Sequence, residues 1–124
     1  MTAPAAAGYD AGGIFAAIDR KDTAAFVGFL TDDAVFRFGS APPVTGREAI
    51  FAAVDAFFDT IAGLTHTINR SLVEGSTRIC EGEVTYTRLD GTQITLPFVD
   101  VFDYAGEQIR HYKIYMDISP LYAG

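Results

Sequence analysis

The sequence is poor in positive charge and in cysteine. Its 124 residues include 9 Lys and Arg against 16 Asp and Glu, which gives a formal net charge of −7. Because that charge repels DNA, RNA and anionic membranes at long range, we expect none of them as a partner. The one cysteine, Cys80, cannot form a disulfide within the chain, and this fits a reducing compartment.

We also expect neither a targeting segment nor a membrane-spanning segment. The start of the chain, MTAPAAAGYDAGG, lacks the basic region and the long apolar run of a signal peptide. No later apolar run is long enough to span a bilayer. We therefore expect a cytoplasmic protein.

Sequence signatures of metal, nucleotide and nucleophilic chemistry are absent as well. The two histidines, His66 and His111, have no second His or Cys at metal-ligand spacing. The chain has no G-x-S-x-G motif, no phosphate loop and no Rossmann fingerprint. We therefore expect neither a metal nor another cofactor.

Apolar residues are what the sequence has in quantity. Hydrophobic residues make up 49% of the chain, and 10 residues are Phe. Such a composition is too apolar for a disordered chain. A length of 124 residues suits one domain with one core. We expect a flexible tail over residues 1–9 and a single domain over residues 10–124.

Helical spacing of apolar residues marks the first half of the chain. It predicts helices over residues 10–20 and 22–30, the second with Asp22 as its N-cap, followed by a short strand over residues 34–38. A third helix is expected to begin at a capping box of Thr45 and a glutamate three residues later, and to carry a long apolar stripe.

The second half of the chain favours strands. Segments rich in β-branched and aromatic residues, separated by short turn sequences, run over residues 64–73, 77–89, 92–104 and 108–118. Helices followed by an antiparallel meander predict an α+β domain in which the helices pack on one face of the sheet.

The segment LPFVDVFDY raises a question because it carries Asp100 in an otherwise apolar strand. The preceding Asp90-Gly91 is typical of a two-residue type I′ hairpin. In that register Glu81 lies opposite Asp100, and Glu83 lies on the same face. Directly opposed carboxylates repel each other, so either water screens them or one of them holds a proton.

Both faces of this predicted hairpin are largely apolar. Leu96, Phe98 and Phe102 share the face of Asp100, and Cys80 alternates onto the other. One face can pack under the helices while the other packs on a second subunit, which favours a dimer through the sheet. The simpler alternative is that the two glutamates form the solvated face of a strand and the aspartate lies in water near a rim.

The segments GIFAAIDRKD, FLTDDAVFRFG, TGREAI and PFVDVFDYAGEQIRHYKIYMD resemble the nuclear transport factor 2-like superfamily. That superfamily includes ketosteroid isomerase, limonene epoxide hydrolase and SnoaL-like polyketide cyclases. The resemblance implies a cone-shaped fold in which three N-terminal helices pack on a curved antiparallel sheet around an internal apolar pocket. It also implies a homodimer, here through the outer face of the sheet.

The resemblance to ketosteroid isomerase gives Asp100 a role. Its position matches the isomerase acid that stays protonated in an apolar site and donates a hydrogen bond to a developing oxyanion. Ile14 stands in place of the isomerase's oxyanion-hole tyrosine, and Phe38 in place of its general-base aspartate. The resemblance therefore implies a shared acid without the rest of that catalytic set.

The epoxide hydrolases offer a second template. Glu83 matches their strand aspartate, Glu81 replaces the arginine two residues before it, and Ile114 stands where the last strand carries a further aspartate. This catalytic set is also incomplete. The alignment nevertheless implies that both glutamates face the pocket together with Asp100.

The last expected strand adds one polar candidate. The resemblance implies that Tyr112, Ile114 and Met116 face the pocket, and a hairpin can bring Tyr112 beside Asp100 so that its hydroxyl donates to the aspartate or to a ligand. An ordinary half-buried strand tyrosine is the alternative. His66 can serve as a base at the mouth of the cavity or be a half-exposed strand histidine.

We therefore expect a small cofactor-independent enzyme of isomerase, hydratase, cyclase or epoxide hydrolase type that acts on a small hydrophobic or cyclic molecule. Protonated Asp100 would act as the acid and ionised Glu83 or Glu81 as the base, with Tyr112 beside them. The expected substrate-binding residues are Ile14, Ile18, Phe38, Phe51, Phe58, Leu96, Phe98, Phe102, Ile114 and Met116. The alternative is a non-catalytic domain that binds a hydrophobic ligand or dimerises.

Overall fold

The computed structural model describes residues 12–123, so the tail expected over residues 1–9 lies outside the described residues. In chain order, the elements are α1 (Gly12–Asp19), α2 (Thr23–Gly28), β1 (Leu30–Phe38), β2 (Val44–Thr45), α3 (Arg47–Phe58), β3 (Ile61–Glu74), β4 (Thr77–Arg88), β5 (Gln93–Ala105), β6 (Gln108–Tyr115) and α4 (Ser119–Tyr122).

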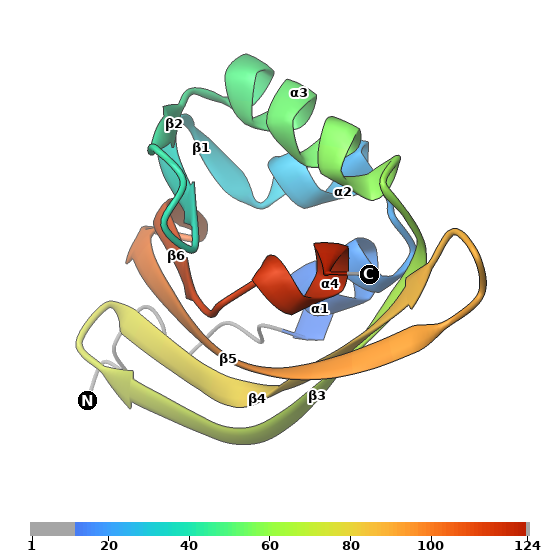
Figure 1. Ribbon diagram of the computed structural model, residues 1–124. Coiled ribbons are helices and arrows are strands. Elements are labelled where there is room, and N and C mark those ends of the chain that lie inside the picture. The colour runs from blue at the N-terminus through green and yellow to red at the C-terminus, as the bar shows by residue number, and fades with distance from the viewer. Residues whose placement is uncertain (1–11, 124) are drawn as a thin grey trace.

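The strands form one curved sheet in the order β2-β1-β6-β5-β4-β3. The long strands β3, β4 and β5 curve round one side of the molecule, and the helices lie on the inner side of that curve (Figure 1). The predicted α+β cone is confirmed, with one correction. Because β1 pairs in parallel with β6, the sheet is mixed rather than antiparallel throughout.

The helices begin and end for local reasons that the sequence shows only in part. Asp22 caps α2 as predicted, since its carboxylate accepts a hydrogen bond of 3.1 Å from the backbone N–H of Ala25. The predicted capping box at α3 is wrong. Thr45 belongs to β2, and Gly46, whose φ of +93° suits glycine, occupies the N-cap of α3 without a side-chain hydrogen bond.

The core fills the space between the helices and the concave face of the sheet. Its largest fully buried side chains include Phe26, Phe102 and Tyr112. Lys21 joins two elements at the edge of this core, because its Nζ donates to the backbone oxygens of Phe58 and Ile61 at 3.2 and 2.9 Å. Within residues 12–123, no helix is long and apolar enough to cross a membrane.

The β4–β5 hairpin is one residue out of the expected register. Its turn contains three residues rather than two, because the backbone of Arg88 bonds both to Gly91 and to Thr92. Gly91 has a φ of +89°, as the residue after a type I turn requires. Asp90 fixes this turn through hydrogen bonds of 2.9 and 2.6 Å from the backbone N–H and the hydroxyl of Thr92.

This shift moves the predicted glutamates to the other face of the sheet. Cys80, not Glu81, lies opposite Asp100, and Glu83 lies opposite Pro97. Because side chains alternate between faces, Cys80 is buried on the concave side and both glutamates point outward. The predicted meeting of Glu81 and Glu83 with Asp100, and the predicted outward position of Cys80, are therefore wrong.

Candidate functional site

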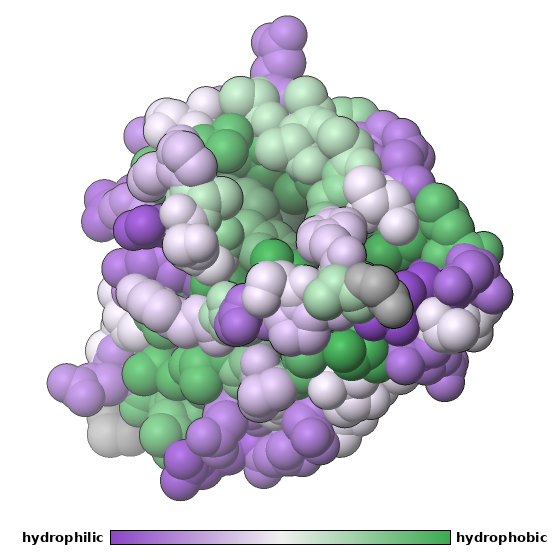
Figure 2. Space-filling view, viewed as in Figure 1, coloured by the Kyte–Doolittle hydropathy of each residue, from purple (hydrophilic) through white to green (hydrophobic). Residues whose placement is uncertain are grey.

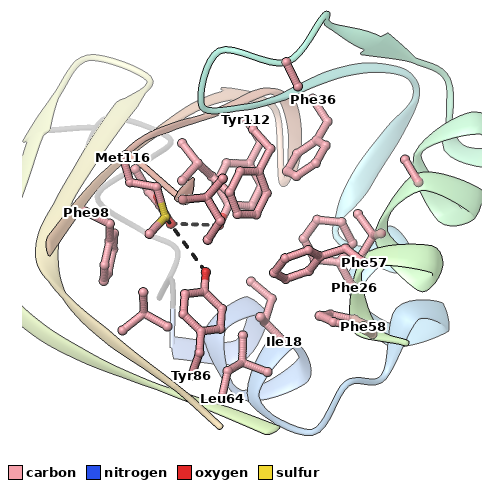
Figure 3. A pocket seen from close by; sticks show the side chains of 18 of the residues that line it. Ile18, Phe26, Phe36, Phe57, Phe58, Leu64, Tyr86, Phe98, Tyr112 and Met116 are labelled. Carbon is pink, nitrogen blue, oxygen red and sulfur yellow. Dashed lines mark hydrogen bonds between the residues drawn. The ribbon is translucent and has the colours of Figure 1, made fainter. Parts of the chain in front are cut away.

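A cavity of about 270 Å³ lies between the concave face of the sheet, the helices and the C-terminal segment. The space-filling view shows it as a hollow whose walls are mostly green, with pale purple residues on parts of its rim (Figure 2). The side chains that line it are almost all apolar, and ten of them are labelled in Figure 3. Such a cavity suits a small hydrophobic ligand, and its volume lies just below the usual range of ligand pockets, which is roughly 300 to 1,000 Å³.

The cavity contains part of the predicted binding set. The residues from that set that line it are Ile18, Phe38, Phe58, Phe98, Ile114 and Met116. Ile14, Leu96 and Phe102 are instead buried in the core outside the lining, and Phe51 is 39% exposed. The prediction was wrong for Phe51 because Ile50, which is fully buried, holds the inward position in the first turn of α3.

Sequence reasoning missed several lining residues. They come from α2, β1, β2, α3, β3 and β4 and from the loop before β2, and they include Phe26, Phe36, Pro42, Val44, Val54, Phe57, Leu64, Val84 and Tyr86. The residues of β4 were missed because the register was wrong by one. Phe57 belonged to the predicted stripe of the third helix, and that signal was available.

Asp100 is the buried acidic group of this cavity. It is 1% exposed, and its Oδ2 accepts a hydrogen bond of 2.8 Å from the hydroxyl of Tyr112. The predicted approach of Tyr112 to Asp100 is confirmed. Oδ1 has no hydrogen-bond partner among the residues that the structure describes. An unpaired buried carboxyl oxygen is costly, and in a cavity lining it is available to a ligand.

The surroundings of Asp100 favour its protonated form. Burial raises the pKa of Asp100 to about 8, although the hydrogen bond from Tyr112 opposes this shift. At neutral pH the carboxyl group therefore holds a proton. Because Oδ2 accepts from Tyr112, Oδ1 is the oxygen that carries this proton and can donate it.

Aromatic rings hold Tyr112 in place. Its ring centroid lies 4.4 Å from that of Phe102, 5.4 Å from that of Phe36 and 5.9 Å from that of Phe26. Burial and the neighbouring Asp100 raise the pKa of Tyr112, so its hydroxyl remains a donor. The packing therefore fixes both partners of the Asp100–Tyr112 hydrogen bond.

Tyr86 presents a second hydroxyl to the cavity. Figure 3 shows it pointing toward the sulfur of Met116, with an Oη to Sδ distance of 3.9 Å. Thioether sulfur is a weak acceptor, so a ligand oxygen can compete for this hydroxyl. Burial, and then the nearby Asp100, raise the pKa of Tyr86.

His66 is a further polar group of the lining, besides Tyr122, and it is held by a carboxylate from α1. Its Nδ1 lies 2.6 Å from Oδ1 of Asp19, and its backbone N–H donates to Oδ2 of Asp19 at 3.1 Å. The ring packs on Phe15 and Phe98, with centroid distances of 5.0 and 5.2 Å. Burial lowers the pKa of His66, and Asp19 opposes that shift in part.

The two glutamates have no part in this cavity. Glu81 lies 3.2 Å from Arg70 in an exposed ion pair, and Glu83 is exposed on the same outer face. Over residues 12–123, no group of three or more His, Cys, Asp or Glu side chains is placed to hold a metal ion. The chemistry available in the cavity is therefore that of Asp100, His66 and the hydroxyl groups of Tyr86, Tyr112 and Tyr122.

Comparisons with known proteins agree with this fold. The sequence model of a family described as the SnoaL-like domain matches residues 12–112. No curated protein matches the chain. An NTF2-like protein of unknown function from Burkholderia pseudomallei is similar in structure, with a TM-score of 0.80 and 16% identity over 89% of each chain.

Two further solved structures show the same likeness. A protein with a ketosteroid isomerase-like fold from Catenulispora acidiphila, in complex with trimethylamine, has a TM-score of 0.80 and 19% identity over 87% of this chain and 85% of its own. An LEH-like epoxide hydrolase from M. tuberculosis has a TM-score of 0.77 and 15% identity over 95% of this chain and 86% of its own. At these identities the likeness shows the fold.

Proposed function

The chain belongs to the SnoaL-like domain family, and from that membership and its buried acid we propose that it is a small enzyme. Its substrate is a small hydrophobic or cyclic molecule that binds in the cavity. The observation that carries the proposal is the burial of Asp100, which is 1% exposed, has a pKa raised by burial to about 8 and has no partner for Oδ1 among the described residues.

The proposed role of Asp100 is that of a general acid. Its Oδ1–H donates to a carbonyl, hydroxyl or epoxide oxygen of the substrate, where negative charge develops in the transition state. When the proton is transferred, the carboxylate that remains is stabilised by the hydrogen bond from Tyr112. The apolar lining strengthens both interactions because it excludes water.

Several reactions share this requirement for an acid. Isomerisation, dehydration, cyclisation and epoxide opening each develop charge on an oxygen atom, so all four reactions fit the family and the acid equally well. The epoxide hydrolase among the similar structures makes epoxides and cyclic ketones the first compounds to test.

The test is turnover by the wild type and by a matched pair of variants. The protein is incubated with a panel of cyclic ketones and epoxides, and products are identified by mass spectrometry. For any compound turned over, Asp100→Asn should lower kcat at least about a hundredfold, and Glu83→Gln on the outer face should leave it unchanged. Equal rates for Asp100→Asn and the wild type would refute the acid role.

A second function has its own supporting observation. The cavity lining is almost entirely apolar, and both catalytic sets of the related enzymes are incomplete in this chain. An apolar cavity is sufficient for a domain that binds a hydrophobic molecule without changing it chemically. Recovery of a bound molecule that stays chemically unchanged on prolonged incubation with the protein would favour binding over turnover.

We also propose a homodimer through the outer face of the sheet. Leu72, Ile79 and Val101 lie side by side there across β3, β4 and β5, and Leu72 is 54% exposed. A contiguous apolar patch of this kind marks an interaction surface. Sedimentation velocity should give a dimer for the wild type and a monomer for the double variant Ile79→Lys and Val101→Lys.

A further inference from the structure

We propose that the cavity also binds small lipophilic amines, and that the amine nitrogen shares one proton with the unpartnered Oδ1 of Asp100. Such an amine is a second class of ligand, beside the oxygen compounds of the proposed reaction. The inference rests on the proposed function only in that it places a small molecule against Asp100. It does not require that the amine is turned over.

The buried carboxyl group of Asp100 has no cation beside it. Within residues 12–123, no Lys or Arg side chain lines the cavity, and His66 is held by Asp19 instead. Charged groups in a protein interior are normally paired, so without a cation the carboxyl group keeps its proton. A ligand that brings a positive charge and N–H donors to Oδ1 lets the group ionise and gives this oxygen a partner.

The other oxygen of Asp100 is already suited to a negative charge. The hydroxyl of Tyr112 donates to Oδ2 at 2.8 Å, and this hydrogen bond lowers the pKa of Asp100 against the effect of burial. With an ammonium group at Oδ1, each carboxylate oxygen accepts a charge-assisted hydrogen bond. A buried ion pair is favourable only when its remaining hydrogen bonds are made in this way.

Aromatic side chains provide the rest of a cation site. Six phenylalanines and three tyrosines line the cavity. The face of an aromatic ring attracts a cation that lies within about 6 Å of its centroid, and the attraction grows when water is excluded. The same rings bind the hydrocarbon part of a lipophilic amine. The lining therefore suits both parts of such a ligand.

Tyr86 adds a second acceptor for the amine. Its hydroxyl donates to the sulfur of Met116, at an Oη to Sδ distance of 3.9 Å, so the lone pairs of its oxygen can accept from the ligand (Figure 3). The net charge of −7 on the whole chain also raises the local concentration of cations. Both features favour an amine over a neutral ligand of the same shape.

The proton balance of the pair determines how its affinity depends on pH. Below about pH 8 free Asp100 holds one proton, and a free alkylamine, with a pKa near the value of about 10.4 for lysine, holds another. The bound pair holds one proton between Oδ1 and nitrogen, so binding releases the other to water. Above about pH 8 Asp100 has already lost its proton and binding releases none. The affinity should rise up to about pH 8 and then level off.

Other titratable groups face Asp100 or line the cavity with it. They come from β3, β4, β6 and α4, and they are His66, Cys80, Tyr86, Tyr112 and Tyr122. Burial raises the pKa of Tyr86 and of Tyr112, so both keep their protons up to pH 8.5. Burial lowers the pKa of His66 below 6.5, so this ring stays neutral from pH 7 upward. Variants at Cys80 and Tyr122 serve as controls for the remaining two groups.

The test is calorimetry at pH 7 and pH 8.5 with 1-cyclohexylethylamine and acetylcyclohexane, two compounds of nearly the same shape. The amine should bind the wild type about tenfold more tightly at pH 8.5. Buffers with different heats of ionisation should show release of about one proton per amine at pH 7 and far less at pH 8.5. The ketone can only accept a proton, so its affinity should fall over the same range as Asp100 ionises.

Asp100→Asn tests whether the pair is responsible. The substitution keeps the size of the side chain and removes the acid, so the amine should bind at least about tenfold more weakly than to the wild type at pH 8.5. Cys80→Ala and Tyr122→Phe should keep the pH dependence of the wild type. Equal affinity of the amine for Asp100→Asn and the wild type at pH 8.5 would overturn the inference, and so would an affinity that falls from pH 7 to 8.5.

The two compounds separate this inference from the proposed function. If the ketone binds and weakens at pH 8.5 while the amine does not bind, the inference fails and Asp100 remains a proton donor to oxygen. If the amine behaves as expected while the affinity of the ketone is independent of pH, the inference holds and the donor role of Asp100 fails.

Discussion

Two carboxylates on neighbouring strands, Asp100 on β5 and Glu83 on β4, have opposite surroundings. Asp100 lies on the concave face, 1% exposed, and burial raises its pKa to about 8. Glu83 lies on the outer face, in water. The same chemical group is a proton donor on one side of the sheet and an ordinary surface charge on the other. The register between β4 and β5 determines which face of the sheet each side chain occupies, and therefore which of the two roles each carboxylate has.

The strongest test of this contrast is the pH dependence of stability. The folded pKa of Asp100 is about 8, whereas its ordinary value is 3.8. Between these values the folded state holds a proton that the unfolded state has released, so stability falls as pH rises. Asp100→Asn removes that slope. The free energy of unfolding of the variant relative to the wild type should rise from pH 4 to pH 8 by on the order of 5 kcal/mol.

Glu83→Gln is the matched control for this measurement. Denaturant unfolding of the three proteins at pH 4 to 8 should give parallel curves for the wild type and Glu83→Gln. Titrations elsewhere in the chain cancel in the difference between each variant and the wild type. Parallel curves for Asp100→Asn and the wild type would show that Asp100 is ionised or solvated in the folded protein.

The contrast between faces can be repeated on β6 with two tyrosines. Tyr112 is 1% exposed and donates to Asp100, whereas Tyr115 is 56% exposed. Tyr112→Phe leaves Oδ2 of Asp100 without its donor and should cost about 1–3 kcal/mol of stability. Because this hydrogen bond lowers the pKa of Asp100, its loss should also move the end of the pH slope upward.

Tyr115→Phe is the control and should change stability by less than about 0.5 kcal/mol. Thermal unfolding at pH 6 and pH 8 measures both variants. Equal losses of stability for the two variants would contradict the predicted difference between the faces, because the hydrogen bond to Asp100 would then contribute nothing measurable.

The sequence was sufficient for what depends on local pattern. Helical spacing followed by strand alternation predicted an α+β domain. The resemblance to the superfamily added the cone shape and the pocket-facing side of Tyr112, which a hairpin then places beside Asp100. These two residues are only 12 positions apart and their strands form a hairpin, so one turn sets their relation. A prediction about two residues this close in the sequence does not require knowledge of the rest of the fold.

The predictions that failed depend on turn length and on long-range contacts, which local sequence patterns do not determine. A two-residue and a three-residue turn both suit Asp90-Gly91, and only the hydrogen bonds to Thr92 decide between them. The contact between Asp19 and His66 joins residues 47 positions apart and has no sequence motif. Local sequence patterns also do not predict the parallel pairing of β1 with β6. Long-range contacts therefore supplied the second polar group of the site.

The two histidines give a smaller test of the same comparison. Burial lowers the folded pKa of His66 below 6.5, so the unfolded state takes up a proton first as the solution is acidified. Stability should fall by up to about 1.4 kcal/mol per pH unit from pH 6.5 down to the folded pKa. His66→Gln should lack this loss and His111→Gln should keep it, as measured by denaturant unfolding from pH 7 to 5. An unchanged slope in His66→Gln would assign the loss to another group.

The smallest effect is expected from the ion pair of the outer face. Glu81 and Arg70 are 47% and 63% exposed and lie 3.2 Å apart. In a single subunit water screens such a pair and holding two long side chains together costs entropy, so in the monomeric double lysine variant Glu81→Gln should change stability by less than about 1 kcal/mol, and less still in high salt. In the wild type the proposed dimer covers this face, so the loss from Glu81→Gln should be larger and less sensitive to salt. Equal, small losses in the wild type and in the double lysine variant would show that no second subunit covers the ion pair.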